Sequence, residues 1–197
     1  MTERRTGIAN VAPEDLMTDA GSATTMAELA SALQEHDLFW PPSSLVSPDR
    51  TLGEMLSHAP GGHTRLGAVI RRYVLSLDVR LADGRTLRAG ARTVKCVTGY
   101  DLKQLFIGSR GCLGTIVAAT LRLESEANRA AVELRMERDY AGIEAAVAGV
   151  GPAGDDWRDV LARLKAELDP EGALPSVDSL WPPTGSANGG ASNTGEA

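Results

Sequence analysis

Three glycines, at positions 108, 111 and 114, lie between a short amphipathic stretch and a long apolar run. Because glycine has no Cβ atom, it lets the main chain adopt a positive φ and approach a flat or anionic ligand closely. The amphipathic stretch predicts a short helix, and Asp101 is placed to cap it. The order helix, loop, strand is the reverse of a Rossmann phosphate turn, so this loop does not indicate NAD.

A second candidate segment runs from Thr51 through Gly53 to the glycine pair at positions 61 and 62. A helix that begins near Thr51 is expected to direct free backbone N–H groups outward, where they suit a pyrophosphate. The Glu54 carboxylate would repel a diphosphate unless it points away. The alternative interpretation is a capped surface helix followed by a glycine turn.

Two histidines, His58 and His63, and two cysteines, Cys96 and Cys112, are the other candidates for chemistry near these segments. Neither histidine has a second ligand at metal-binding spacing, and most histidines in such loops are simply solvated. The cysteines form no CxxC motif and lie near no histidine cluster, so they indicate neither a disulfide framework nor a zinc site. We therefore expect no metal centre.

The overall composition excludes several classes of protein. The chain has 197 residues, 43% of them hydrophobic, with a formal net charge of −6 and a pI near 5.1. The length fits one domain, with or without a flexible tail, and the negative charge argues against a nucleic-acid partner. No apolar run approaches the roughly 20 residues of a membrane span, and the N-terminus lacks a signal-peptide core. We expect a cytoplasmic protein.

The segments around the candidate loops predict an α+β arrangement. A capping box at Thr25 and Glu28 begins a helix that ends near Gln34. Alternating residues around an Asp-Gly turn predict a β-hairpin over residues 73–89. The other expected elements are strands at 16–20, 114–123 and 131–136 and helices at 140–150 and 156–167. Few helices separate the strands between 73 and 137, which favours a mixed or antiparallel sheet with packed helices over a parallel doubly wound sheet.

The segments Gly99-Tyr100-Asp101-Leu102 and Leu105-Phe106-Ile107-Gly108-Ser109, followed by Gly111 and by the run from Leu113 to Leu123, resemble a known family. It is the FAD-binding domain of the p-cresol methylhydroxylase and vanillyl-alcohol oxidase type, in particular the FAD-binding subunits of bacterial glycolate oxidase and D-lactate dehydrogenase. The resemblance covers about residues 13–126 and 155–175. It implies the fold of the second subdomain of that FAD-binding domain.

The resemblance also implies a noncovalently bound FAD and the residues that contact it. Gly111 and Gly114 would admit the flavin, and Gly53, Ser57 and Gly62 would lie on the pyrophosphate side. The full set of cofactor-binding candidates is Thr51, Gly53, Ser57, His58, Gly62, Gly108, Arg110, Gly111, Cys112, Gly114 and Ile116. Arg110 and Cys112 depart from the family, which often has an acidic or neutral residue and a threonine there.

Two parts of the full-length family have no counterpart in this sequence. One is an N-terminal glycine-rich loop that binds the FAD pyrophosphate, and the other is most of a cap domain that holds the substrate. The expected organisation is therefore a flexible N-terminus (1–12), a partial FAD-binding domain (13–126), a remnant of the cap region with a C-terminal helix (127–175) and a disordered tail (176–197).

Three functions are compatible with these observations. The first is the FAD-binding component of a 2-hydroxy-acid oxidoreductase of the glycolate or D-lactate kind, which needs a partner chain for activity. That partner would be a subunit that supplies the missing loop and cap, or an iron–sulfur electron-transfer subunit. The second is a degenerate, noncatalytic subunit that keeps the fold for protein–protein contact, and the third is an unrelated α+β scaffold. The sequence indicates no catalytic residue.

Overall fold

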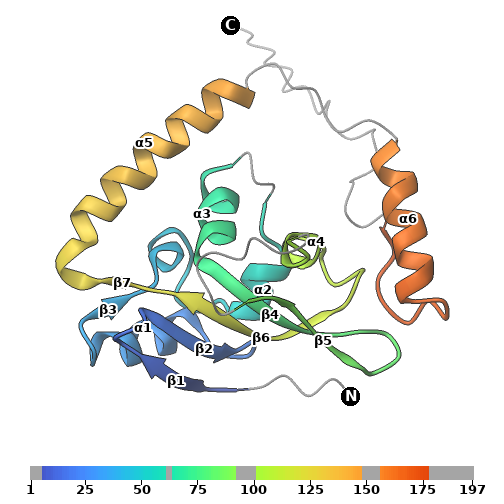
Figure 1. The fold of residues 1–197 in the computed structure, drawn as a ribbon, viewed down its shortest axis with the longest axis horizontal. Coiled ribbons are helices and arrows are strands. Elements are labelled where there is room, and N and C mark those ends of the chain that lie inside the picture. The colour runs from blue at the N-terminus through green and yellow to red at the C-terminus, as the bar shows by residue number, and fades with distance from the viewer. Residues whose placement is uncertain (1–5, 61–63, 92–100, 148–155, 178–197) are drawn as a thin grey trace, which may run out of the picture.

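The protein is described by a computed structural model that covers residues 6–60, 64–91, 101–147 and 156–177. Its centre is a five-stranded antiparallel sheet with the strand order β1-β2-β6-β4-β5, and a two-stranded sheet of β3 and β7 lies beside it (Figure 1). The strands are β1 (Ile8–Ala12), β2 (Met17–Gly21), β3 (Leu38–Phe39), β4 (Val74–Arg80), β5 (Thr86–Gly90), β6 (Thr115–Arg122) and β7 (Glu124–Ser125). The predicted α+β class with an antiparallel sheet is confirmed.

The helices are α1 (Met26–Gln34), α2 (Leu52–Ser57), α3 (Arg65–Tyr73), α4 (Lys103–Phe106), α5 (Arg129–Val147) and α6 (Asp156–Leu168), with 3-10 helices η1 (Pro41–Leu45) and η2 (Glu126–Asn128). Thr25 and Glu28 form the predicted capping box of α1. Thr51 and Glu54 form a second capping box at the start of α2. Both helices therefore begin where a Thr-x-x-Glu pattern satisfies the first backbone N–H groups.

The central strand of the sheet is β6, which lies between β2 and β4. Leu77 of β4 and Ala20 of β2 both pair with Ala119 of β6. The first strand of the predicted hairpin, β4, and the predicted strand after Gly114, β6, therefore belong to one sheet, as the sequence predicted. The β4–β5 hairpin closes at the predicted Asp-Gly turn, where Gly84 has a φ of +82°. The Asp83 carboxylate accepts a hydrogen bond from the backbone N–H of Arg85.

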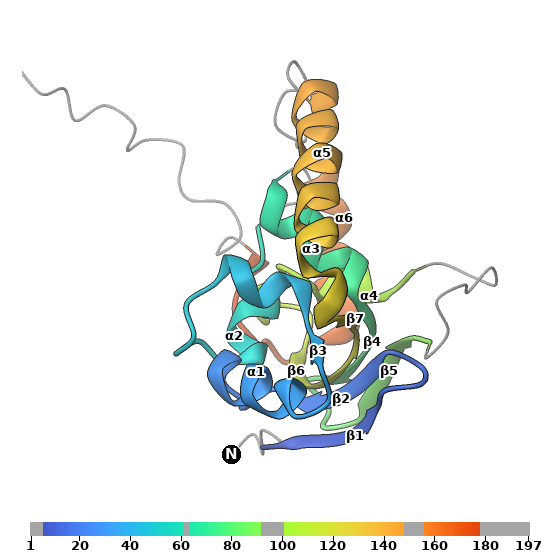
Figure 2. The ribbon, with the colours of Figure 1, turned by 90° about the vertical axis from the view of Figure 1, so that its left-hand side faces the viewer.

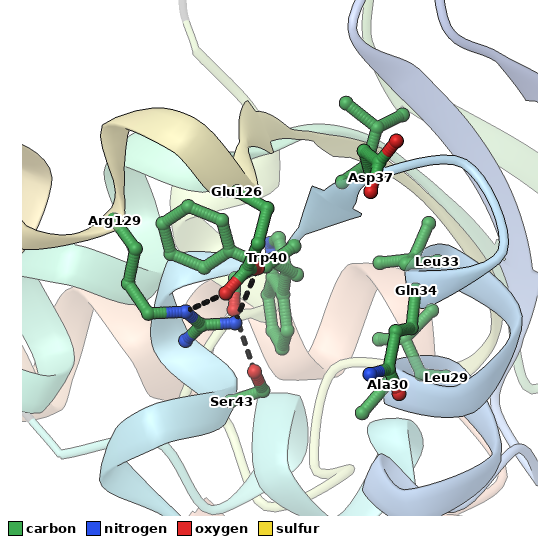
Figure 3. A pocket seen from close by; sticks show the side chains of 11 residues that line it. Leu29, Ala30, Leu33, Gln34, Asp37, Trp40, Ser43, Glu126 and Arg129 are labelled. Carbon is green, nitrogen blue, oxygen red and sulfur yellow. Dashed lines mark hydrogen bonds and ion pairs between the residues drawn. The ribbon is translucent and has the colours of Figure 1, made fainter.

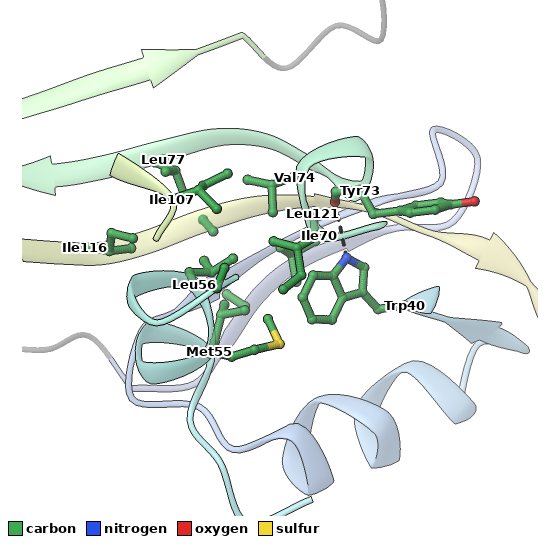
Figure 4. Packing of buried hydrophobic residues seen from close by; sticks show 14 of the residues in the cluster. Trp40, Met55, Leu56, Ile70, Tyr73, Val74, Leu77, Ile107, Ile116 and Leu121 are labelled. Carbon is green, nitrogen blue, oxygen red and sulfur yellow. Dashed lines mark hydrogen bonds between the residues drawn. The ribbon is translucent and has the colours of Figure 1, made fainter. Parts of the chain in front are cut away.

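The hydrophobic core lies between one face of this sheet and helices α1, α2 and α3. Figure 4 shows side chains of α2 and α3 packed beneath β4 and β6, with the Trp40 ring beside them. Trp40 is fully buried, and its indole N–H donates to the backbone carbonyl of Tyr73 at 3.2 Å. This core fixes α2 against the centre of the sheet, next to the start of β6.

Helix α5 differs from its prediction. The expected strand at 131–136 and the expected helix at 140–150 are instead parts of one helix, Arg129–Val147. Val132 and Met136, four residues apart, are buried, whereas Leu134 between them is 69% exposed. Helical spacing, not alternation, therefore decides which side chains enter the core. Figure 2 shows α5 standing beside α3 and extending beyond the sheet.

Three other local expectations differ from the structure. Residues 8–12, expected to be flexible, form β1 and pair with β2. Asp101 does not cap α4; its carboxylate binds the side chains of Lys103 at 2.5 Å and Gln104 at 2.9 Å. Helix α3 was not predicted, although Thr64 caps it and its buried residues recur at helical spacing. The expected tail from residue 176 lies almost entirely outside the described residues.

Candidate functional site

A pocket of about 210 Å³ lies between α2 and the loop at residues 107–114, which we name the glycine loop. The pocket, named here the α2–loop pocket, is lined by Gly53, Glu54, Ser57, His58, Arg110, Gly111, Thr115, Ile116 and Pro175. Six of these residues are predicted cofactor contacts. Two segments about 50 residues apart in the sequence, predicted separately to bind one cofactor, therefore meet at one site.

Two backbone hydrogen bonds hold the glycine loop on the C-terminal end of α2. The N–H of Gly108 donates to the carbonyl of Leu56 at 2.9 Å, and the N–H of Arg110 donates to the carbonyl of Ser57 at 2.8 Å. The last carbonyls of a helix have no partner within it, so the loop supplies the missing donors. Gly108, Arg110 and Gly111 all have positive φ, between +50° and +81°, which gives the loop the curvature for this contact.

The glycines of the loop have different roles. A Cβ atom on Gly108 would lie 2.6 Å from the carbonyl oxygen of Ala59, and one on Gly114 would lie 2.5 Å from a methyl group of Val79. These two glycines are needed for packing within the protein. A Cβ atom on Gly111 would meet no atom within 4 Å. The open space beside Gly111 is where a ligand can approach the main chain.

The N-terminal end of α2 does not offer the free N–H groups that the sequence suggested. Its first three N–H groups donate to the carbonyls of Thr24 and Ser22, both at 2.8 Å, and to the hydroxyl of Thr51 at 3.3 Å. The Glu54 carboxylate points back and accepts from the N–H of Thr51 at 3.2 Å. A Cβ atom on Gly53 would lie 2.9 Å from the Ser22 carbonyl oxygen, so close packing of α2 explains this glycine.

His58 ends α2 and presents its ring to the pocket. Its Nδ1 lies 3.0 Å from the carbonyl oxygen of Glu54, which can only accept a hydrogen bond. Nδ1 therefore carries the proton, and a neutral His58 ring offers Nε2 as an acceptor. His58, one of the predicted cofactor contacts, is thus a polar group with a fixed ring orientation at the site.

Arg71 on α3 holds the loops behind the pocket, and the sequence analysis missed it. Its guanidinium donates to the carbonyl of Pro60 at 2.8 Å and to the carbonyl of Ile107 at 3.1 Å. It thereby joins the segment after α2 to the start of the glycine loop. Burial lowers the pKa of the Arg71 guanidinium, which still remains charged at neutral pH. The helical spacing of the buried residues of α3 is the sequence signal that could have placed Arg71 on a helix, two residues before Tyr73.

A turn after α6 supplies the last wall of the pocket through Pro175. The buried Asp169 carboxylate organises this turn, because it pairs with Lys165 and accepts from the N–H groups of Ala173 at 2.8 Å and Leu174 at 2.9 Å. The Lys165 ammonium and these two N–H groups hold the pKa of Asp169 below its usual range. The turn that Asp169 organises therefore contributes a wall of the site.

The remaining predicted contacts lie elsewhere. Thr51 caps α2, and Gly108 and Gly114 pack inside the fold. Cys112 is buried, and burial raises the pKa of its thiol although the nearby charge of Lys165 acts in the opposite direction. Gly62, with His63, lies outside the described residues.

A second hollow, of about 260 Å³, lies between α1, β3 and the start of α5 and contains none of the predicted residues (Figure 3). Its polar edge is formed by Arg129, which binds both carboxylate oxygens of Glu126 and lies 4.1 Å from the centroid of the Phe39 ring. Because Arg129 is already paired and stacked, this hollow is explained by packing of α5 and is not the candidate site. No helix among the described residues is long and apolar enough to cross a bilayer.

Comparison with known proteins gives matches over part of the chain. Residues 1–90 match the family described as FAD binding domain. D-lactate dehydrogenase of Archaeoglobus fulgidus is 37% identical over 123 residues, which cover 62% of this chain and 27% of that protein. Glycolate oxidase subunit GlcD of Bacillus subtilis is 33% identical over 117 residues, covering 59% and 25%. Glycolate oxidase subunit GlcE of Escherichia coli is 30% identical over 133 residues, covering 66% and 38%. The matches thus span only 25% to 38% of the length of these relatives.

Proposed function

We propose that this chain, which contains an FAD-binding domain of the glycolate oxidase and D-lactate dehydrogenase type, is the FAD-binding component of a 2-hydroxy-acid oxidoreductase. The observation that carries the proposal is the α2–loop pocket, where predicted cofactor contacts from α2 and from the glycine loop line one cavity. The open space at Gly111 supports close approach of a flat ligand to the main chain.

We further propose that a second chain completes the site. The pocket has a volume of about 210 Å³, below the roughly 300–1,000 Å³ of sites that bury most of a drug-sized ligand. FAD is larger than such a ligand, so this chain would cover only part of it. The names of two relatives, GlcD and GlcE, describe subunits of an oxidase. A partner subunit that adds the remaining walls, or an iron–sulfur subunit that accepts electrons, fits this arrangement.

The chemistry of the proposed enzyme belongs mainly to its cofactor. When bound, FAD would supply the acceptor for a hydride from the α-carbon of the 2-hydroxy acid. The residues of this chain would bind and orient it: Gly111 gives access, His58 offers Nε2 as an acceptor, and Arg71 keeps the glycine loop in place. The groups that hold the substrate carboxylate and take its hydroxyl proton are assigned to the partner.

A noncatalytic role is the second candidate, and one observation favours it. The first three N–H groups of α2, expected to face a pyrophosphate, are all bound within the protein. A subunit that kept the fold only for contact with a partner would tolerate such a change. The two functions differ in whether the purified chain binds FAD.

The experiment that separates them is a titration of the purified chain with FAD, followed by the visible spectrum and by equilibrium dialysis. We expect saturable binding and no turnover of glycolate or D-lactate with an artificial electron acceptor. Absence of FAD binding would favour the noncatalytic role. Robust turnover by the isolated, FAD-loaded chain would show that no partner is needed, because general acid–base help worth about 10² to 10⁴ in rate would then come from this chain.

A further inference from the structure

Arg80, the last residue of β4, carries a positive charge that no group in the described part of the chain neutralises. The residue is half-buried, and its Nε atom is enclosed by the protein without a hydrogen-bond acceptor. An enclosed donor without an acceptor is unfavourable for folding, because it has given up its water and gained no partner. Arg80 is therefore a candidate for binding a group from outside the chain.

The carboxylates of the β4–β5 hairpin are already paired with other arginines. Asp78 pairs with Arg88 at 3.2 Å, and Asp83 pairs with Arg85 at 2.5 Å. The hairpin, residues 74–90, contains two carboxylates and three arginines. Arg80 is the arginine that these ion pairs leave over, so it is available to an anion from outside the hairpin.

The register of the sheet places Arg80 beside the α2–loop pocket. Arg80 pairs with Thr115 of β6, which lines the pocket, and β4 and β6 lie side by side (Figure 1). A Cβ atom on Gly114, in the glycine loop, would lie 3.1 Å from the backbone carbonyl oxygen of Arg80. Directly opposed residues of antiparallel strands share one face of the sheet, with Cβ atoms about 4.5–5.5 Å apart. An arginine side chain is longer than this separation, so the Arg80 guanidinium can reach the edge of the pocket.

The groups that line the pocket leave the role of anion binding open. The first three N–H groups of α2 are bound within the protein. Glu54 and Arg110, the charged lining residues, already interact within the protein. His58 offers an acceptor when it is neutral. Among the described residues, the uncommitted positive charge beside the pocket is that of Arg80.

We propose that Arg80 binds a phosphate group of FAD at the edge of the α2–loop pocket where β4 meets β6. The inference rests on the proposed function above. A guanidinium suits this task because its planar donors match two phosphate oxygens at once. A substrate carboxylate offers the same anionic chemistry, and the test distinguishes the two sources.

The test compares the wild type with R80Q, which removes the charge, and R80K, which keeps the charge but loses the planar pair of donors. The matched control is R85Q, which changes the net charge equally in the same hairpin, at a side chain that is 78% exposed and paired with Asp83. The ligands are FAD and ADP, which carry a pyrophosphate, riboflavin, which carries no phosphate, and D-lactate. Their affinities are measured by calorimetry at two ionic strengths.

For R80Q we expect affinities for FAD and ADP at least about tenfold weaker than wild type, because a charge-assisted contact is lost. Riboflavin and D-lactate should bind R80Q and the wild type equally. R80K should keep part of the FAD affinity and R85Q all of it, and the loss in R80Q should shrink at high ionic strength. Because Arg80 has no partner among the described residues, R80Q should unfold at a urea concentration no lower than the wild type does.

Four results would overturn the inference: an equal loss of riboflavin affinity in R80Q, a loss confined to D-lactate, the same loss of FAD affinity in R85Q, or unchanged FAD affinity in R80Q. The last of these would leave the proposed function intact. Absence of FAD binding by the wild type would instead refute the proposed function, and this inference with it, before any variant is compared.

Discussion

Gly111 and Gly84 form a matched pair that separates a binding role of the glycine loop from its backbone geometry. Both have nearly the same φ, +81° and +82°, and a Cβ atom on either would meet nothing within 4 Å. A methyl group at either position therefore costs only the left-handed conformation, about 1–2 kcal/mol of unfolding free energy. For a chain of this size, each kcal/mol lowers the unfolding temperature by roughly 2–4 °C.

The two substitutions should differ in cofactor binding. G111A places a methyl group in the open space of the α2–loop pocket, and forcing an extra methyl into a packed contact costs about 1–3 kcal/mol, or roughly a 5- to 150-fold loss of FAD affinity. G84A lies in the β4–β5 turn and should bind FAD as the wild type does.

Urea unfolding and FAD titration of both variants provide the assay. Equal destabilisation with an affinity loss confined to G111A is the expected result. Equal FAD affinity in the two variants would refute the reasoning, since it would show that the space beside Gly111 does not receive the cofactor. G114A serves as a third variant and should destabilise more than either, because its Cβ would lie 2.5 Å from Val79 and 3.1 Å from the Arg80 carbonyl oxygen.

Three further predictions concern buried polar contacts that hold the fold and the pocket together. R71M should lower the unfolding free energy by about 1–3 kcal/mol, because the carbonyls of Pro60 and Ile107 lose a charged donor, and FAD titration should show weaker binding. D169N should remove stability that the wild type has at neutral pH: since the folded pKa of Asp169 is lowered, mainly by Lys165, its contribution is present above about pH 3.9 and is lost as pH falls through the lowered pKa, so denaturant midpoints of wild type and variant should converge in acid. Y73F should cost about 1–3 kcal/mol in urea unfolding, because the buried Glu124 carboxylate loses the Tyr73 hydroxyl at 3.0 Å.

Elements that depend on neighbouring residues were predictable from the sequence. The capping box at Thr25 and the Asp-Gly turn at residues 83 and 84 are local patterns, and both occur where predicted. The run after Gly114 was predictable as a strand for the same reason. Each rests on chemistry within a few residues of the chain.

Features decided by contacts distant in sequence were not predictable. Val132, Leu134 and Met136 alternate like a strand, and only their packing shows that Leu134 faces solvent on a helix. The acceptors that occupy the N–H groups of α2 come from Ser22 and Thr24, some 30 residues earlier. A helix N-terminus with free N–H groups and one whose N–H groups are bound within the protein have the same local sequence. The sequence therefore could not decide between a ligand-binding site and internal packing of the helix.

The position of β6 at the centre of the sheet has a consequence for the biosynthesis of the protein. A ribosome releases β1, β2, β4 and β5 before it releases the strand that joins them. The contact between Asp19 and Thr120 spans 101 residues, so β2 and β4 must each wait with an unpaired edge that β6 will cover. Such long-range pairing slows folding and exposes strand edges to aggregation during translation. Because the glycine loop immediately precedes β6, the α2–loop pocket cannot form before this late step, and a ligand of that pocket cannot stabilise the nascent chain earlier.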